Sequence, residues 1–185
     1  MEKPEIVSRA VIWEGSIETI ETLQLRWGPG HTQQRVVVRT LPGAVIFAVN
    51  DRDQVLLIEA YRPAVDDFLI ELPAGKVESG NSPLEGAKRE LAEETGLAAS
   101  DWTDLGTTCG AQGSSNWKCH YFLARGLKHG DSAPEPHENH RLFWLSLSEC
   151  WQWVVDGRIR NNFSIVAATK ALCYLGRLTF MYQDR

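Results

Sequence analysis

Residues 75–97 contain the sequence GKVESGNSPLEGAKRELAEETGL, which determines the most about the fold. Its second half has the pattern of a helix that starts after Ser82 and stops at Gly96. Serine is a favoured N-cap, the proline that follows suits the first helical position, and Glu85 completes a capping box. Glycine is the usual residue just beyond a helix end. We therefore expect a helix over 83–95, preceded by a loop.

Three carboxylates share one face of this expected helix. Glu90 and Glu94 are four residues apart, which places their Cβ atoms about 5–6 Å from each other, and Glu93 borders the same face. Like charges at this spacing destabilise a helix by a few tenths of a kcal/mol per pair, a cost that a divalent cation would remove. Mg²⁺ binds carboxylate oxygens and leaves positions for substrate phosphates. A solvated acidic face is the alternative interpretation.

The segment before the helix favours a metal site. Residues 71–80, ELPAGKVESG, contain two glycines, Gly75 and Gly80, and a proline, Pro73. We expect this segment to form a loop. Glycine permits backbone geometries in which a carbonyl can face a bound ion. Residues 75–97 also follow the pattern Gly-x5-Asn-x7-Arg-Glu-Leu-x-Glu-Glu-x-Gly-Leu. This pattern resembles the signature of the Nudix hydrolases at every fixed position except Asn81, where the family has glutamate.

The resemblance covers most of residues 35–175. Tyr61-Arg62-Pro63 and the segment 71–75 are similar to the branch that acts on ADP-ribose and related nucleoside diphosphate sugars. The resemblance implies an α+β Nudix fold, a mixed β-sheet between helices, over residues 41–185. It also implies that residues 1–40 form an N-terminal antiparallel strand lobe that dimerises the protein.

Hydrophobic patterning predicts the remaining elements. Alternating and β-branched stretches bounded by turn residues indicate strands at 6–13, 18–27, 34–40, 44–49, 54–60, 103–109, 118–124 and 141–145. A second capping box, Ser146 with Glu149, predicts a helix over 147–155, and a last helix is expected over 164–175. Residues 128–138 are polar, contain two prolines and are expected to form a loop.

The resemblance also implies roles for individual residues. The Ala74 carbonyl, Glu90 and Glu94 would bind a metal ion, Glu93 would serve a further ion and contribute to catalysis, and Arg89 would orient the carboxylates. The expected ion is Mg²⁺, with Mn²⁺ as the alternative.

The resemblance implies that the substrate contacts and the general base lie outside the helix. In this branch a carboxylate from a late loop activates the attacking water, which makes Glu138 the candidate and Glu135 the alternative. Arg39 and Arg62 are candidates for the phosphates or the terminal sugar, and Glu71 for the base or ribose. Either arginine could instead be an ordinary surface residue.

Two departures from the family pattern change these expectations. Asn81 lacks a negative charge but still accepts hydrogen bonds, so we expect weaker loop anchoring or weaker binding of an extra ion rather than loss of the site. Residues 112–116, QGSSN, lack the acidic residue that the branch usually carries after the serine. This leaves the exact substrate open.

Histidine and cysteine give weaker signals. His137 and His140 are three residues apart, but a structural zinc site needs four ligands and no further pair is nearby. None of the four cysteines forms a CxxC pair, and we expect buried thiols in a reducing compartment.

Composition restricts the partners. The 185 residues include 19 Lys plus Arg against 24 Asp plus Glu, a net charge of −5, which argues against a nucleic-acid or membrane-surface binder. No apolar run approaches the roughly 20 residues of a membrane-spanning helix, and the first residues lack the apolar core of a secretion signal. We expect a cytoplasmic homodimer whose partner is a small nucleotide substrate.

Three functions fit these expectations. The first is a metal-dependent diphosphatase that hydrolyses ADP-ribose or another nucleoside diphosphate sugar to a nucleoside monophosphate and a sugar phosphate. The second is a pyrophosphatase of the same fold that sanitises nucleoside triphosphates and releases inorganic pyrophosphate. The third is a module that binds a nucleotide sugar without cleaving it, an alternative that Asn81 keeps open.

Overall fold

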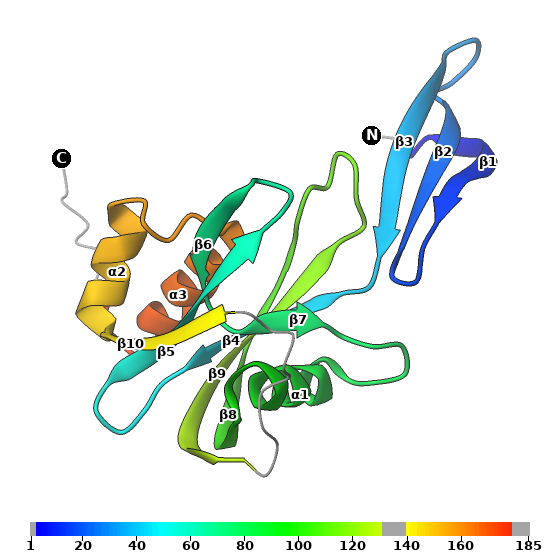
Figure 1. Ribbon diagram of the computed structural model, residues 1–185. Coiled ribbons are helices and arrows are strands. Elements are labelled where there is room, and N and C mark those ends of the chain that lie inside the picture. Colours follow the sequence, from blue (N-terminus) through cyan, green and yellow to red (C-terminus); the bar gives the residue numbers. More distant parts are fainter. Residues whose placement is uncertain (1–2, 131–139, 179–185) are drawn as a thin grey trace, which may run out of the picture. The chain divides into compact units, whose positions relative to one another are not determined.

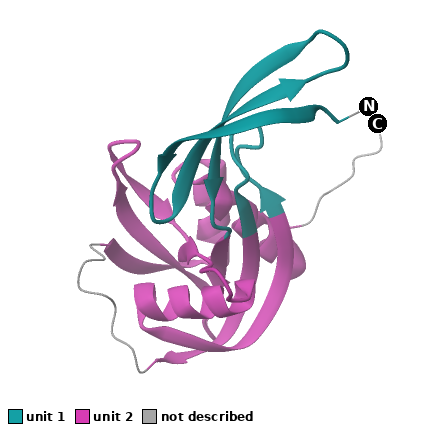
Figure 2. Ribbon diagram, turned by 90° about the vertical axis from the view of Figure 1, so that its right-hand side faces the viewer, with its two compact units in different colours: residues 1–42, 108–119 teal, residues 43–107, 120–185 magenta. Residues whose placement is uncertain are grey.

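The computed structural model describes residues 3–130 and 140–178 and divides into two compact units (Figure 2). Unit 1 comprises residues 1–42 with 108–119, and unit 2 comprises residues 43–107 with 120–185. The strands are β1 (Glu5–Glu14), β2 (Glu18–Arg26), β3 (Thr32–Thr40), β4 (Gly43–Ala48), β5 (Gln54–Arg62), β6 (Asp67–Glu71), β7 (Ala74–Lys76), β8 (Leu97–Cys109), β9 (Lys118–His129) and β10 (His140–Ser146). The helices are α1 (Pro83–Thr95), α2 (Leu147–Val155) and α3 (Asn162–Tyr174).

Unit 1 is built on an antiparallel sheet in the order β1-β2-β3. The first two strands, expected at 6–13 and 18–27, pair as an antiparallel hairpin. Residues 108–119 attach to β3, where the Val38 N–H donates to the Ser114 carbonyl at 2.7 Å. Strand β1 lies at a sheet edge and is exposed along its whole length. Its apolar side chains Val11, Ile12 and Trp13 are more than half exposed.

Unit 2 places two sheets between helices, which agrees with the expected α+β class. The sheet orders are β10-β5-β6 and β7-β4-β9-β8. Both α1 and α3 contact the wholly buried strand β4, and Figure 1 shows the two helices on different sides of it. Helix α2 packs on α3, β5 and β10. The part of the chain that the structure describes has no helix long and apolar enough to cross a membrane.

Helix α1 begins and ends where the sequence predicts. The Ser82 hydroxyl accepts the Glu85 N–H at 3.2 Å, the Glu85 carboxylate accepts the Ser82 N–H at 2.7 Å, and Gly96 ends the helix in the left-handed region at φ 67°. Its apolar face buries Ala87 and Leu91 completely. Full burial of a leucine contributes about 1.5–3 kcal/mol, so this face fixes α1 against the sheet.

The capping box of α1 predicts a pH-dependent stability. The Ser82 backbone N–H and then the Ser82 hydroxyl hold the pKa of Glu85 below its ordinary 4.5. A lowered folded-state pKa contributes stability above pH 4.5 that is lost as the pH falls through the folded-state value. Urea unfolding should therefore show Glu85→Gln less stable than wild type at pH 7, with the difference gone at a pH well below 4. A difference that stayed constant with pH would contradict the assignment.

Several expected boundaries are wrong in ways that have a physical reason. The expected loop 71–80 contains β7, because Ala74–Lys76 pairs with Val45–Gly43 of β4. Strand β6 was not expected, since its five residues lack strict alternation. Helix α3 starts at Asn162 rather than 164, because the Asn161 side chain accepts the Ser164 N–H at 2.9 Å and acts as N-cap.

Strands β8 and β9 and the cysteines also differ from expectation. Strand β8 starts at Leu97, and β9 continues to His129, so Lys128 and His129 belong to a strand rather than to the expected loop. These long strands expose many residues, which hides them from a search for apolar runs. Cys119 and Cys150 are buried as expected, and burial raises the Cys150 pKa to about 12, whereas Cys109 and Cys173 are exposed.

Candidate active site

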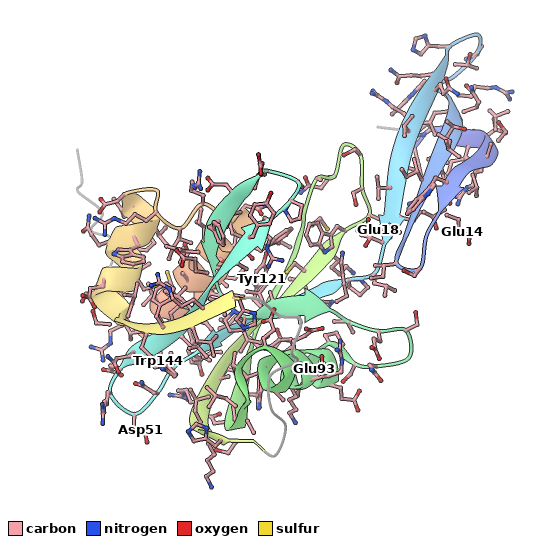
Figure 3. The ribbon with its side chains drawn as sticks, in the orientation of Figure 1. Glu14, Glu18, Asp51, Glu93, Tyr121 and Trp144 are labelled. Carbon is pink, nitrogen blue, oxygen red and sulfur yellow. The ribbon has the colours of Figure 1, made fainter. Side chains whose placement is uncertain are left out.

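The acidic face of α1 is largely buried within unit 2. Glu90 is 8% exposed and Glu94 is 6% exposed. Glu93 is half-buried on the same helix. Its side chain is labelled on α1 in Figure 3. Moving an ionised carboxylate from water into the protein costs several kcal/mol of free energy unless hydrogen-bond or charged partners replace its hydration. This burial therefore argues against the alternative of a solvated acidic face, and it directs attention to the partners.

Arg89 neutralises two of the three carboxylates. Its Nη2 atom donates to Glu90 Oε1 at 2.6 Å and to the Lys76 carbonyl at 2.9 Å, and its Nη1 donates to Glu93 Oε2. Partial burial disfavours the guanidinium charge, but the carboxylates of Glu90, Glu93 and Glu78 outweigh burial and raise the Arg89 pKa. One guanidinium therefore joins two carboxylates of α1 to the end of β7.

Glu94 is held by the main chain of β7. Its Oε2 atom accepts the Ala74 N–H at 2.8 Å. The neighbouring Pro73 carbonyl instead accepts the Ile46 N–H of β4 at 2.9 Å. Because the N–H and C=O of one extended residue point to the same edge of a strand, the Ala74 carbonyl lies on the edge that faces Glu94. The predicted carbonyl ligand and the predicted carboxylate ligand therefore meet at one edge of β7.

Gly75 is required for this approach. A Cβ atom at residue 75 would lie 2.0 Å from the Glu90 carboxylate carbon and 2.1 and 2.3 Å from its oxygens. No side chain can occupy that space while Glu90 keeps its position. The glycine therefore lets the carboxylate pack directly on the β7 backbone.

The oxygen atoms of Glu90, Glu94 and the Ala74 carbonyl are chemically suited to bind a divalent cation. Two buried carboxylates and a main-chain carbonyl are hard oxygen ligands of the kind that Mg²⁺ prefers. In the arrangement described, Arg89 donates to Oε1 of Glu90 and the Ala74 N–H donates to Oε2 of Glu94. Over residues 3–130 and 140–178 no three His, Cys, Asp or Glu side chains converge as a metal site. A metal at Glu90 and Glu94 would share these carboxylates with Arg89 and the Ala74 N–H.

Arg62 at the end of β5 and Glu71 at the end of β6 form an ion pair. The Arg62 Nη2 atom lies 2.6 Å from Glu71 Oε2, and its Nε donates to both carboxylate oxygens at 3.1 and 3.2 Å. Glu71 is 4% exposed, whereas 43% of the Arg62 side chain is exposed. The Arg62 side chain therefore stays partly exposed to solvent while Glu71 is buried.

The other predicted residues are placed differently. Arg39 belongs to unit 1, where its Nε donates to Glu21 Oε2 at 3.2 Å. Glu135, His137 and Glu138 lie outside the described residues. Asn81 donates its side-chain amide to Glu78 Oε2 at 3.5 Å, a long hydrogen bond.

Two further residues support the site in roles that the sequence does not indicate. The buried Ser164 hydroxyl on α3 accepts the Leu72 N–H at 3.0 Å, and the His140 ring contacts the Glu94 carbonyl. The contacts span 92 and 46 residues of sequence, so no local pattern signals them. Two cavities of about 520 and 360 Å³ also occur in unit 2, but both are lined around Leu147 and Arg177 and neither includes a predicted site residue.

The model of the NUDIX domain family matches residues 39–162, which include the whole acidic helix and β7. The chain belongs to the Nudix domain family. This Nudix domain is 32% identical over 165 residues to an ADP-ribose pyrophosphatase from Mycobacterium tuberculosis, covering 87% of this chain and 79% of the relative. It is 30% identical over 159 residues to a methanol dehydrogenase activator from Bacillus methanolicus, covering 84% and 85% of the two chains.

A solved structure confirms the predicted fold. The crystal structure of an ADP compounds hydrolase superposes on this Nudix protein with a TM-score of 0.85, covering 96% of this chain and 98% of the other at 22% identity. At that identity the likeness concerns the fold alone. The expected Nudix fold is therefore present, with the acidic helix and β7 as its candidate active site.

Proposed function

We propose that this Nudix protein hydrolyses the pyrophosphate bond of ADP-ribose or a related nucleoside diphosphate sugar. The observation that carries the proposal is the pair of buried carboxylates on α1, Glu90 and Glu94, packed on the β7 backbone at Gly75 and Ala74. The substrate class is supported by relatives called ADP-ribose pyrophosphatase, from Mycobacterium tuberculosis and, at 30% identity over 122 residues, from Bacillus subtilis.

The protein is proposed to require a divalent cation, with Mg²⁺ preferred and Mn²⁺ as the alternative. Glu90, Glu94 and the Ala74 carbonyl would hold it, and Glu93 would serve a further ion. When bound, such a cation neutralises the acidic cluster, binds phosphate oxygens and polarises phosphorus.

The chain's own residues would prepare the site for an anionic substrate. Arg89 keeps Glu90 and Glu93 oriented from within the helix. Arg62, held by Glu71, would direct its exposed edge to the diphosphate or the terminal sugar, and Glu71 would face the base or ribose. Arg39 is retained as a second candidate for the phosphates.

The proposed reaction is in-line attack of water on one phosphorus of the diphosphate. A P–O bond forms to the water oxygen, the bridging P–O bond breaks, and the proton of the water passes to a carboxylate, with Glu138 as candidate and Glu135 as alternative. With ADP-ribose the products are AMP and ribose 5-phosphate. General-base assistance of this kind contributes about 10²–10⁴-fold.

A substrate panel tests the proposal. The protein is incubated with ADP-ribose, GDP-mannose, UDP-glucose, NADH and dGTP in the presence of Mg²⁺, and the products are separated by chromatography. We expect cleavage of ADP-ribose or another nucleotide sugar to two monophosphates, without inorganic pyrophosphate. Pyrophosphate release from dGTP alone would instead support a triphosphate-sanitising enzyme. Thermal stabilisation by a nucleotide sugar without product would support a non-catalytic binding module.

We also propose that the N-terminal lobe, residues 1–40, dimerises the protein. Support comes from β1, an exposed edge strand with Val11, Ile12 and Trp13 facing solvent, because such edges and apolar patches usually meet a partner. Light scattering after size exclusion should give twice the 20.8 kDa chain mass, and replacing Val11 and Trp13 with aspartate should give the single mass. A monomeric wild type at micromolar concentration would exclude this role.

A cytoplasmic location belongs to the same proposal. It is supported by four free cysteines, as expected in a reducing compartment. The acidic net charge of −5 supports a separate part of the proposal, that the protein does not bind nucleic acids or membrane surfaces.

A further inference from the structure

The carbonyl of Glu94 lies in the last turn of α1, where a helix leaves its carbonyls without intrahelical partners. Neighbouring carbonyls find nearby donors: the Ala92 carbonyl accepts the Gly96 N–H at 2.9 Å, and the Gly96 carbonyl accepts the Gly130 N–H at 2.8 Å. The Glu94 carbonyl instead lies 2.7 Å from Nε2 of His140. Since a carbonyl only accepts, Nε2 must carry the hydrogen in this contact.

His140 comes from a distant and firmly paired element. It is the first residue of β10, which pairs with β5 in an unbroken register from His140 opposite Ala60 to Ser146 opposite Gln54. The strand therefore fixes the backbone position from which the imidazole extends. The end of α1 is therefore capped by a side chain that is distant in sequence, because the sheet brings His140 next to the Glu94 carbonyl.

Glu94 is consequently held at both ends. Its carboxylate accepts the Ala74 N–H of β7 at 2.8 Å, and its main-chain carbonyl is held by β10 through His140. The two strands are in different sheets of unit 2, β7 in the sheet with β4 and β10 in the sheet with β5. Movement of the last turn of α1 would shift the carboxylate away from Ala74, and the His140 contact opposes that movement.

We propose that His140 is a positioning residue for the metal site: by fixing the main chain of Glu94, it holds the Glu94 carboxylate beside the Ala74 carbonyl. The inference rests on the proposed function, because it assumes that Glu94 binds the cation. Groups that orient a metal ligand typically contribute 10–100-fold to metal affinity.

The test compares two substitutions of similar size that differ in hydrogen bonding. His140→Gln keeps an N–H donor, whereas His140→Met has none. Mn²⁺ affinity is measured on the full chain without substrate, from the electron paramagnetic resonance signal of free Mn²⁺. We expect His140→Met to weaken Mn²⁺ binding about 10-fold and His140→Gln to recover most of the loss. His140→Ala is a second donor-free variant in case His140→Met does not fold.

Ser82→Ala is the matched control, because it removes the cap at the opposite end of the same helix. It should lower the urea midpoint and leave Mn²⁺ affinity close to wild type. An equal loss of affinity in Ser82→Ala and His140→Met would show general fraying of α1 and overturn the inference, as would unchanged affinity in His140→Met. Absence of Mn²⁺ binding by wild type would be a different result, because it would refute the metal site itself.

Discussion

Glu94→Gln is expected to lower ADP-ribose turnover at saturating Mg²⁺ by about 10³-fold while leaving the fold intact. Glutamine keeps an oxygen that can accept the Ala74 N–H, so the contact between α1 and β7 is retained. It loses the negative charge that a divalent ligand set needs. A bound cation supplies several kcal/mol of transition-state stabilisation, and about 4 kcal/mol corresponds to roughly 10³-fold in rate.

The comparison needs a second glutamate on the same helix. Glu85→Gln changes the same functional group at the exposed N-terminal end of α1, where Glu85 bonds only the cap residue among its described contacts. At pH 7 it should lower stability and leave kcat near wild type. Circular dichroism and urea unfolding of both variants separate loss of chemistry from loss of fold. Near wild-type turnover by Glu94→Gln would remove Glu94 from the proposed metal site.

Gly75→Ala is expected to lower kcat/KM about 10²-fold. The added methyl would lie 2.0 Å from the Glu90 carboxylate carbon, so Glu90 must move, and its contact with Arg89 must move with it. A misplacement of about 1 Å in a catalytic arrangement can cost this much. The substitution should also weaken Mn²⁺ binding measured without substrate.

Gly113→Ala provides the matched control for this change. A Cβ atom at residue 113 would meet nothing within 4 Å, and the residue does not occupy the left-handed region. Its Mn²⁺ affinity and urea midpoint should equal those of wild type. If Gly75→Ala bound Mn²⁺ as tightly as Gly113→Ala, the close packing of Glu90 on β7 would have no bearing on metal binding.

The features that sequence predicts well are those encoded by neighbouring residues. The start of α1 depends on Ser82 and Glu85, and its end depends on Gly96. Each of these residues acts on the helix turn next to it, and the structure places both caps where the pattern indicates. The same holds for α2, whose capping box joins Ser146 and Glu149. The acidic face follows from helical spacing alone.

The features that escape prediction depend on contacts between distant segments. Strand β7 exists because three residues pair with β4, and their sequence, Ala-Gly-Lys, has no strand pattern of its own. The pairing of Arg62 with Glu71 and the contact of His140 with Glu94 likewise require the folded sheets. Sequence therefore indicates which carboxylates matter, whereas the structure indicates what holds them.

The most direct test of the metal site is anomalous diffraction from crystals soaked in MnCl₂. We predict a manganese peak bound by the carboxylates of Glu90 and Glu94 and by the carbonyl of Ala74. A crystal in which the Glu90–Arg89 and Glu94–Ala74 contacts persist, with no anomalous peak beside them, would contradict the account.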